Sequence, residues 1–451
     1  MDNLSLLLDL YELSMAECYF HYKKETLASF DLFIRDLPPN RFFLVCAGLV
    51  DILDYIKTLS FSQQDLNYLK SKKLFSVDFL KYLSKFKFRG DIWAMPEGEI
   101  FFANEPIIRV TAPIIEAQVI ESFLLNTVNL QTMIASKAAR VVLAAKDKGV
   151  YDFSLRRTHG PFAGIKVARC AYLAGCLGTS NVLAGKLYKI PVAGTMAHSF
   201  VMSFKQEIDS FLAYSNTFPD KTTLLVDTYN TKKGIKNAID IGLYLKAKHH
   251  CLQAVRLDSG DIILLSKLAR RMLDKAGLAY VKIFASGNLD EFKIKYLIAH
   301  GAKVDNFGVG TNMGTSEDAP SLDIIYKISE VTNEDGRFLP TMKLSKGKVT
   351  YPGRKQVFRI QDKKQRFIKD ILGLEKEKIN ARPLLIKVVD KGKVIYKPPA
   401  LDTTRKRVKN NLSRFHEEIR EVYSKYKYPV IISPQLKKLR QSLAQQLEKR
   451  Q

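Results

Sequence analysis

The chain has 451 residues, and its 71 lysines and arginines exceed its 46 aspartates and glutamates to give a formal net charge of +25 at pH 7. A hydrophobic content of 46% over this length excludes a largely disordered chain and leaves room for two or three domains with cores of their own. The charge predicts anionic partners, such as nucleic acid, membrane lipid or phosphorylated small molecules, although a solvated basic surface is the simpler explanation.

The cysteines and the N-terminus indicate a soluble cytoplasmic protein. The five cysteines are scattered and contain no C-x-x-C pair, which argues against a disulfide framework or a zinc site and fits a reducing compartment. The first apolar run has no basic residues before it and is interrupted by Asp9, Glu12 and Glu17, unlike a signal peptide. No apolar run approaches the roughly 20 residues that span a bilayer.

Residues 1 to about 110 mix helical stretches with two expected strands, at 91–95 and 99–110. Two apolar-periodic helices are then expected at 114–129 and 130–149, the second ending at Gly149 as a helix C-cap. Beyond about 365 the chain is lysine-rich and has a helical pattern. The N-terminal part is therefore expected to be mixed α and β, and the C-terminal tail to be basic and helical.

Residues 222 to 312 alternate short apolar runs with helical patterns four times over. The runs are "TLLVD", "LQAVRLD", "AYVKIFA" and "KVDNFGVG", and helical patterns separate them. This βαβαβαβ order predicts a parallel sheet with right-handed crossovers, either an open doubly wound sheet or a β/α barrel. In both, the loops at the carboxyl ends of the strands build the functional site.

The last two strand ends are rich in glycine and small polar residues. They are "SGN", with Gly287 and Asn288, and "GVGT", with Gly308, Gly310 and Thr311. Glycine lets backbone N–H groups approach phosphate oxygens closely, and the helix that begins near "NLDE" adds its positive end. A plain turn is the alternative for each loop taken alone, but two such loops on adjacent strands favour a phosphate site.

The two preceding strand ends carry carboxylates and an arginine. "RLDSGD" contains Arg256, Asp258 and Asp261, and Asp227 ends the strand before it. Such carboxylates can accept sugar hydroxyls or hold Mg²⁺ through water, while the arginine can bind a carboxylate or phosphate. A helix N-cap and a structural salt bridge are the alternative, and this alternative is strongest for Asp261.

Two further segments carry candidate anion contacts. Arg156 and Arg157 precede Pro161, which is expected to open a helix that runs to about Ala174. His198 follows "AGTMA", where a structural histidine is the usual interpretation. Small hydroxyls flank His198, and they would also suit a histidine approached by phosphate.

Eight motifs, in this order along the chain, resemble those of the nicotinate phosphoribosyltransferases. They are "LLLDLYELSMAECYF", "DFSLRR", "GTSNVLAG", "IPVAGTMAHS", "VDTYNT", "VRLDSGD", "ASGNLDE" and "FGVGTNMGTS". The resemblance covers roughly residues 5 to 330 and continues near 351–359. It implies an α/β protein of the type II phosphoribosyltransferase kind, with an incomplete β/α barrel and an α+β domain formed by the N- and C-terminal segments. The expected ranges are 1–112 for the N-terminal segment, 113–330 for the barrel and 331–451 for the C-terminal segment with its basic tail.

The resemblance also implies a reaction and its residues. ATP-coupled transfer from 5-phosphoribosyl 1-diphosphate (PRPP) to nicotinate, with Mg²⁺, would give nicotinate mononucleotide and diphosphate in NAD salvage, in a homodimer with shared active sites. His198 would be phosphorylated by ATP, and Asp258 would contact ribose or Mg²⁺. The pyridine ring would stack between Phe153 and Tyr11 of the partner subunit, with Arg256 near its carboxylate and Ser180 favouring the acid. Arg156 and Arg157 would contact phosphates of PRPP, and the cradle for its 5′-phosphate would comprise Gly287, Asn288, Gly308, Gly310 and Thr311.

Two alternatives remain at this stage. A nicotinamide phosphoribosyltransferase of the same fold would favour an acidic residue at position 180, and a quinolinate enzyme would need extra cations for its second carboxylate. A nucleic-acid-binding protein would use the basic C-terminal region, but the aromatic residues that would stack on bases are few there.

Overall fold

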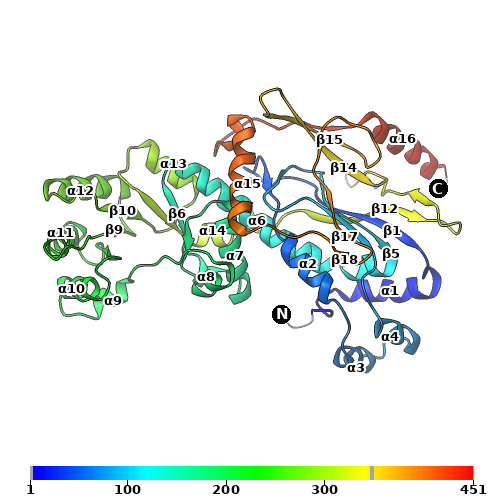
Figure 1. The fold of residues 1–451 in the computed structure, drawn as a ribbon, viewed down its shortest axis with the longest axis horizontal. Helices are drawn as coiled ribbons and strands as arrows, with labels where there is room; N and C mark the ends of the chain where they lie inside the picture. Colours follow the sequence, from blue (N-terminus) through cyan, green and yellow to red (C-terminus); the bar gives the residue numbers. More distant parts are fainter. Residues whose placement is uncertain (1–3, 346–349, 450–451) are drawn as a thin grey trace. The chain divides into compact units, whose positions relative to one another are not determined.

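The computed structural model describes residues 4–345 and 350–449, and Figure 1 colours its ribbon along the chain. Contacts divide the chain into two compact units. Unit 1 comprises Met1–Met133, Ser321–Ile419 and Ser424–Gln451, and unit 2 comprises Ile134–Pro320 and Arg420–Tyr423. These boundaries differ from the expected 113 and 330, because α5 (Ile114–Val119) packs on α1 (Leu10–Tyr22) and the strand after residue 320 joins the sheet of unit 1.

Unit 1 is built on a seven-stranded sheet that joins the N-terminal and C-terminal segments. Its order is β13-β12-β1-β5-β3-β17-β18, with every neighbouring pair antiparallel. β1 is almost entirely buried and lies between β12 and β5. The strands are β1 (Leu27–Ile34), β3 (Asp91–Ala94), β5 (Pro106–Pro113), β12 (Ile324–Thr332), β13 (Phe338–Pro340), β17 (Ile386–Asp390) and β18 (Lys393–Val394).

Two smaller sheets complete the strands of unit 1. β2 (Leu44–Val45) pairs with β4 (Ile100–Phe101), and a four-stranded sheet has the order β16-β14-β15-β19. Its strands are β14 (Lys355–Gln361), β15 (Phe367–Leu374), β16 (Arg382–Pro383) and β19 (Val430–Ile432). The expectation of a helical tail beyond 365 was therefore wrong for 367–394, where alternating apolar residues form strands that bury against this unit.

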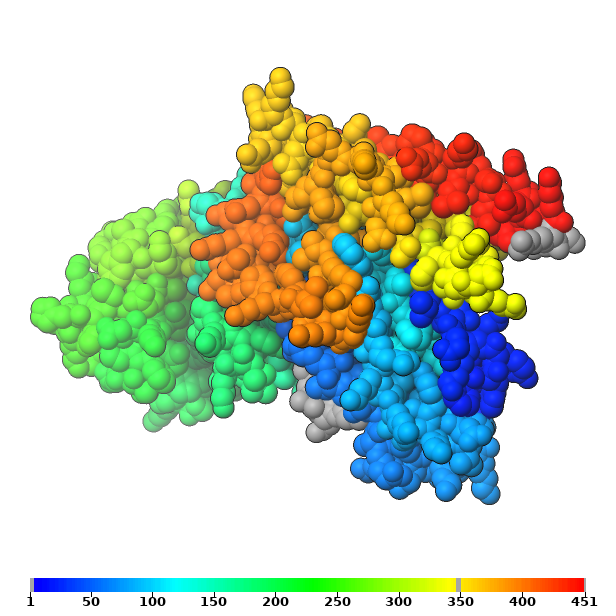
Figure 2. Space-filling view, turned by 45° about the vertical axis from the view of Figure 1, so that its right-hand side comes forward, coloured from blue at the N-terminus to red at the C-terminus, as the bar shows by residue number. Residues whose placement is uncertain are grey.

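The helices of unit 1 come from both ends of the chain. They are α1 (Leu10–Tyr22), α2 (Leu49–Thr58), α3 (Gln63–Ser71), α4 (Val77–Leu83), α5 (Ile114–Val119), α15 (Leu401–Arg414) and α16 (Pro434–Glu448). Figure 2 shows α16, in red, on the surface of this unit. The short helix η2 (Glu417–Arg420) follows α15. Much of the basic charge noted in the sequence lies on α15 and in residues 343–366, of which 346–349 are outside the described residues.

The two helices expected at 114–129 and 130–149 have different limits in the structure. α5 ends at Val119, and α6 runs without interruption over Glu121–Ala145. Gly149 is not a C-cap but the first residue of β6 (Gly149–Asp152). A Cβ at Gly149 would lie 2.2 Å from Oδ1 of Asn306, so this glycine permits close packing of β6 against the neighbouring strand. That steric requirement is tertiary, and the sequence pattern alone looks like a helix end.

Unit 2 is built on a six-stranded parallel sheet with the order β7-β6-β11-β10-β9-β8. The expected βαβαβαβ order at 222–312 is confirmed, and β6 and β7 extend the sheet beyond β11. Because β7 and β8 each have one strand neighbour in this sheet, it is an incomplete barrel. The strands are β6, β7 (Gly178–Thr179), β8 (Thr223–Leu225), β9 (Ala254–Leu257), β10 (Lys282–Ala285) and β11 (Asn306–Val309).

Three helices of unit 2, α11, α12 and α13, begin a few residues after the ends of β8, β9 and β10. Asn230, Asp261 and Asp290 cap α11, α12 and α13, and each side chain accepts a hydrogen bond from a backbone N–H of its helix's first turn. The helices of unit 2 are η1 (Leu155–Arg157), α7 (Pro161–Ala174), α8 (Val182–Tyr188), α9 (His198–Met202), α10 (Glu207–Thr217), α11 (Thr231–Ala247), α12 (Ile262–Lys275), α13 (Glu291–Ala299) and α14 (Thr311–Gly314).

Candidate functional site

The carboxyl ends of the six parallel strands place most of the predicted site residues at one edge of the unit 2 sheet. Phe153 follows β6, Ser180 follows β7, and Asp258 follows β9. The loops "SGN" and "GVGT" stand at the ends of β10 and β11. Parallel pairing brings these ends together although up to 158 positions separate them in the sequence, from 153 to 311.

Arg256 connects three segments of this edge. Its Nε donates to Oγ of Ser286 at 2.8 Å, and its Nη1 donates to Oγ1 of Thr195 at 2.8 Å and to the carbonyl of Met196 at 3.3 Å. Its Nη2 donates to Oδ1 of Asp258 at 2.7 Å. The guanidinium carbon lies 5.7 Å from the centroid of the Phe153 ring. Arg256 therefore organises the edge and also places positive charge beside the Phe153 ring.

Asp258 is a partly buried carboxylate with several donors around it. Burial alone would raise its pKa, but hydrogen bonds from Ser286 and Arg256, together with the charge of Arg256, hold the pKa below its usual range. Its backbone N–H donates to Oδ2 of Asp227 at 2.9 Å. Asp258 is thus anionic at neutral pH and firmly oriented.

Asp227 supplies a second carboxylate beside Asp258. Its Oδ2 accepts from the backbone of Asp258 and from Oγ of Ser259 at 2.6 Å. Its buried Oδ1 has no hydrogen-bond partner among the described residues. Mg²⁺ is commonly held by one or two carboxylates together with water and substrate phosphates, so this pair fits that ion. The described residues contain no group of three or more histidine, cysteine or acidic side chains that would hold a metal by themselves.

His198 is the first residue of α9 and is partly exposed. Its Nδ1 lies 3.1 Å from Oγ1 of Thr228, and its Nε2 lies 3.9 Å from Oδ2 of Asp258. Thr228 follows Asp227 at the end of β8. When Nδ1 carries the proton that Thr228 accepts, the lone pair of Nε2 is available to an incoming group. His198 therefore belongs to the same cluster as Arg256 and Asp258.

Phe153 is held in place by the residue before it. Asp152 is buried, and it accepts from the backbone N–H of Ser154 at 3.0 Å and from Oγ1 of Thr179 at 2.7 Å. Burial raises the pKa of Asp152, and these hydrogen bonds act against that rise. The Phe153 ring stacks with Phe284, with centroids 5.5 Å apart. The two strand ends of β6 and β7 are thereby fixed to one another.

The two glycine loops have different steric requirements. Gly287 has φ +92°, and a Cβ there would lie 2.0 Å from the carbonyl oxygen of Asp258. Gly308 lies inside β11, where a Cβ would lie 2.6 Å from the Phe153 ring, so this glycine makes room for an aromatic side chain. The backbone N–H groups of Gly287, Asn288, Gly310 and Thr311 have no acceptor within the described part of the chain. Those four groups are free to bind an anion.

The remaining predicted residues have separate surroundings. Arg156 and Arg157 form most of η1, and both are exposed, with no ion pair among the described residues. Asp261 caps α12, which is the structural alternative considered for it. Tyr11 belongs to α1 of unit 1 and is 48% exposed, and burial together with the nearby carboxylates of Glu121 and Glu12 raises the pKa of its hydroxyl.

Three residues of the cluster were not predicted as site residues from the sequence. Asp152, Thr228 and Ser286 lie inside the motifs, whereas Thr195 is one of the small hydroxyls noted beside His198. A signal was present for Ser286, because it stands at the same strand-end position as Asp227 and Asp258. Asp152 had no such signal, since an acidic residue at a strand end is usually exposed.

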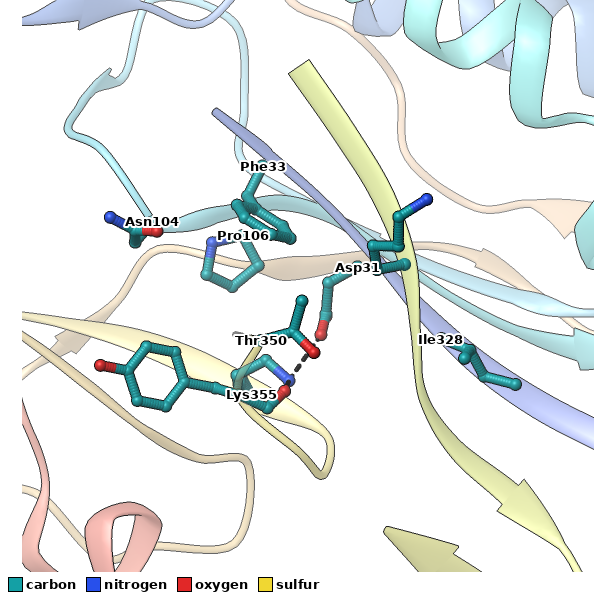
Figure 3. Close-up of a pocket in the computed structure, with 9 residues that line it drawn as sticks. Asp31, Phe33, Asn104, Pro106, Ile328, Thr350 and Lys355 are labelled. Carbon is teal, nitrogen blue, oxygen red and sulfur yellow. Dashed lines mark hydrogen bonds and ion pairs between the residues drawn. The ribbon is translucent and has the colours of Figure 1, made fainter. Parts of the chain in front are cut away.

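Two pockets lie away from the cluster at the edge of the parallel sheet. In unit 1, Figure 3 shows Asp31 and Lys355 facing one another in a pocket on the seven-stranded sheet, with Oδ2 of Asp31 2.7 Å from Nζ of Lys355. In unit 2, an aromatic pocket lies between α9 and α10, lined by Met196, Phe200, Phe204, Ala213, Tyr214, Thr217 and Phe218. None of the predicted site residues lines either pocket.

No helix in the described ranges is long and apolar enough to cross a membrane.

Three family models match the chain in succession. The nicotinate phosphoribosyltransferase N-terminal domain matches residues 6–129, the nicotinate phosphoribosyltransferase family model matches 149–356, and the corresponding C-terminal domain matches 377–440. Together they cover most of the chain, including the whole cluster at the edge of the parallel sheet.

Curated relatives and solved structures agree with these matches. The chain is 44% identical to nicotinate phosphoribosyltransferase pncB2 of Mycobacterium tuberculosis, over 96% of this chain and 92% of that protein. It is 39% identical to nicotinate phosphoribosyltransferase of Bacillus subtilis, over 96% and 93%. The crystal structure of human nicotinic acid phosphoribosyltransferase aligns with a TM-score of 0.86 and 28% identity, over 97% of this chain and 99% of that one. The chain belongs to the nicotinate phosphoribosyltransferase family and has its type II phosphoribosyltransferase fold.

Proposed function

We propose that the chain transfers the phosphoribosyl group of PRPP to nicotinate, coupled to hydrolysis of ATP, and so forms nicotinate mononucleotide and diphosphate in NAD salvage. The observation that carries this proposal is the cluster of Arg256, Asp258, Ser286 and His198 at one edge of a parallel sheet. It combines a fixed carboxylate, a cation and an imidazole beside two glycine loops with free N–H groups. Family membership supplies the pyridine substrate.

PRPP would bind across the strand ends of unit 2. The N–H groups of Gly287, Asn288, Gly310 and Thr311 would hold its 5′-phosphate, because convergent backbone donors suit phosphate oxygens. Gly308 would act indirectly, by leaving room for Phe153. The exposed Arg156 and Arg157 would bind diphosphate oxygens, since nothing in the described chain neutralises them.

Mg²⁺ fits the carboxylates of Asp227 and Asp258, one of which has an unpaired buried oxygen. When bound, the ion would stabilise the negative charge of the diphosphate leaving group. Asp258 would orient the ribose, and Arg256 would keep Asp258 in place.

The transfer itself needs positioning more than covalent chemistry. The bond between C1 of the ribose and the diphosphate oxygen breaks, its electron pair leaves with diphosphate, and the ring nitrogen of nicotinate forms a bond to C1. Phe153 would support one face of the pyridine ring, and Tyr11 of the partner subunit would cover the other, which requires a homodimer. Ser180 carries no charge, so it would not repel the nicotinate carboxylate.

His198 would couple the reaction to ATP. Its ring nitrogen would accept the terminal phosphoryl group of ATP, releasing ADP, and water would later cleave the phosphorus–nitrogen bond to release phosphate. Thr228 would hold Nδ1 and thereby fix the orientation of the ring. The scattered free cysteines support a reducing compartment such as the cytoplasm for this activity.

The test is a product assay with nicotinate, nicotinamide and quinolinate, each with PRPP and Mg²⁺ and with or without ATP. Of the three pyridines, we expect only nicotinate to react well with PRPP, and we expect ATP to increase the rate of this reaction strongly. Turnover of nicotinamide or quinolinate without turnover of nicotinate would overturn the proposal. A second test titrates the protein with duplex and single-stranded nucleic acid at low and high salt. Purely electrostatic binding weakens as salt rises, so binding that is equally tight at both salt concentrations would support the nucleic-acid alternative.

The coupling step has its own variant. His198→Ala should retain basal transfer and lose ATP stimulation, because the phosphoryl acceptor is gone. His300→Ala, in an exposed histidine just after α13, is the matched control and should leave stimulation intact. Full ATP stimulation in His198→Ala would assign the acceptor to another residue.

A further inference from the structure

A cluster of four charged side chains, three of them buried, lies within unit 2. Nζ of Lys137, in α6, is 2.6 Å from Oε2 of Glu291 and 2.8 Å from Oδ1 of Asp318. Nε of Arg140, one turn further along α6, donates to Oε1 of Glu291 at 3.1 Å. The side chains of Lys137, Arg140 and Glu291 are each at most 2% exposed. None of these residues takes part in the chemistry proposed above.

The two carboxylates of this cluster lie just downstream of the two glycine loops. Glu291 is the first residue of α13, three positions after Asn288, and Asp318 follows the short helix α14 that begins at Thr311. The loops are also linked to each other, because Nδ2 of Asn312 lies 3.5 Å from the carbonyl oxygen of Asn288. One ammonium group therefore joins the segments that carry both loops.

Lys137 is the residue of the cluster that contacts both carboxylates. Its ammonium faces Glu291 and Asp318, whereas Arg140 forms its ion pair with Glu291. Oε2 of Glu291 makes no hydrogen bond of good geometry in the described chain, which leaves the ammonium of Lys137 as its counter-charge. Without Lys137, the buried carboxylate of Glu291 would lose one of its two counter-charges, and Asp318 would lose the ammonium that links it to Glu291.

We propose that Lys137 is a positioning residue for the 5′-phosphate of PRPP, because it holds the "SGN" and "GVGT" loops at the spacing that lets both bind one phosphate. Lys137 does not touch the substrate. It acts through Glu291 and Asp318, which fix the starts of the segments after each loop. This inference rests on the proposed function, since it assumes that the two loops bind that phosphate.

The experiment compares steady-state kinetics of the full-length protein and its variants for each substrate. Lys137→Met should raise the KM for PRPP by about tenfold or more, while the KM for nicotinate and kcat change by less than about threefold, because loop misplacement weakens phosphate binding before it affects the pyridine. Lys295→Met is the matched control. It removes the same charge from α13, where Nζ of Lys295 is 2.7 Å from Oε2 of Glu421 in an accessible ion pair, and it should leave every constant unchanged.

A double variant tests whether Lys137 acts through Asp318. Lys137→Met combined with Asp318→Asn removes both ends of this contact, so its KM for PRPP should stay close to that of Lys137→Met and should not reach the product of the two single losses. If Lys137→Met fails to fold, Asp318→Asn alone, at a side chain that is 21% exposed, should raise the KM for PRPP by a few-fold, about threefold, and leave that for nicotinate unchanged.

The outcomes distinguish this inference from the proposed function. An active wild-type protein with unchanged PRPP KM in Lys137→Met or Asp318→Asn would overturn the role of Lys137 alone. Equal losses for PRPP and nicotinate would also overturn it, because they would indicate general damage. Losses that multiply in the double variant would do the same, because they would show that Lys137 and Asp318 act independently. A wild-type protein that does not use PRPP would overturn the proposed function and this inference with it.

Discussion

Replacing Gly287 with alanine is expected to damage both stability and catalysis, for two separable reasons. Gly287 has φ +92°, a conformation that costs an L-residue roughly 1–2 kcal/mol. In addition, the new Cβ would lie 2.0 Å from the carbonyl oxygen of Asp258, which is closer than real Cβ atoms approach any atom. Overpacking of this kind typically costs about 1–3 kcal/mol. The sum predicts a loss of about 2–5 kcal/mol in the free energy of unfolding.

The overlap also acts on the site directly. The atom that must move is the backbone carbonyl of Asp258, the residue whose side chain accepts from Arg256 and Ser286. A displacement of about 1 Å at a reacting group can reduce the rate by about 100-fold. We therefore expect kcat/KM for PRPP to fall by about that factor in Gly287→Ala.

Gly277→Ala is the control that isolates the steric part. Gly277 lies in the same unit and has φ +69°, but nothing lies within 4 Å of a Cβ placed there. It should lose only the backbone cost of about 1–2 kcal/mol and keep its kcat/KM. Urea denaturation and PRPP saturation curves measure both quantities. If the two variants behave alike in both assays, the overlap with Asp258 has no consequence and the reasoning is refuted.

Two further predictions concern substrate choice and pH. Ser180→Asp places a carboxylate where Ser180 is proposed to meet nicotinate, so kcat/KM should fall by about 100-fold for nicotinate and rise relative to it for nicotinamide. Ser180→Asn is the neutral control, and an unchanged preference in Ser180→Asp would place the specificity elsewhere. Burial raises the pKa of Glu12 from 4.5 to about 8 against an opposing hydrogen bond from Ser122. Because the unfolded chain loses this proton first, the free energy of unfolding of the wild type should fall between about pH 4.5 and 8. Glu12→Gln has no carboxyl to ionise, so its free energy of unfolding should fall less over that range. Chemical denaturation at pH 5 and pH 8 measures this difference, and equal pH dependence in both proteins would show that Glu12 is ionised in the folded state.

Local patterns in the sequence were sufficient for the parallel sheet and for much of its functional edge. Each βα unit between 223 and 309 has its own apolar strand, its own amphipathic helix and its own capping residue. Because parallel strands present their carboxyl ends at one edge, Asp227, Asp258 and the glycine loops could be placed together without coordinates. The ordered motifs then indicated the family, which the comparisons confirmed.

Other features depend on contacts between segments far apart in the chain, and these could not be predicted from local pattern. The sequence pattern around Gly149 looks like a helix C-cap, but a glycine is required there because a Cβ would overlap the side chain of Asn306. Gly308 looks like part of a phosphate-binding loop, but in the structure its missing side chain makes room for Phe153. Among the strands after 365 that were mistaken for helix, β17 pairs with the distant β3, and β15 pairs with β19 as well as with the adjacent β14.

Local patterns specify the order of elements between 222 and 312, the chemical character of the strand ends there and the family. Which atoms meet depends on the folded chain: the four hydrogen bonds of Arg256, the Nδ1 contact of His198 with Thr228, and the ion pairs of Lys137. The physical reason is the distance along the chain over which each interaction acts. Periodicity and capping act within a few residues, whereas a buried charge is stable only when a partner far along the chain is folded against it.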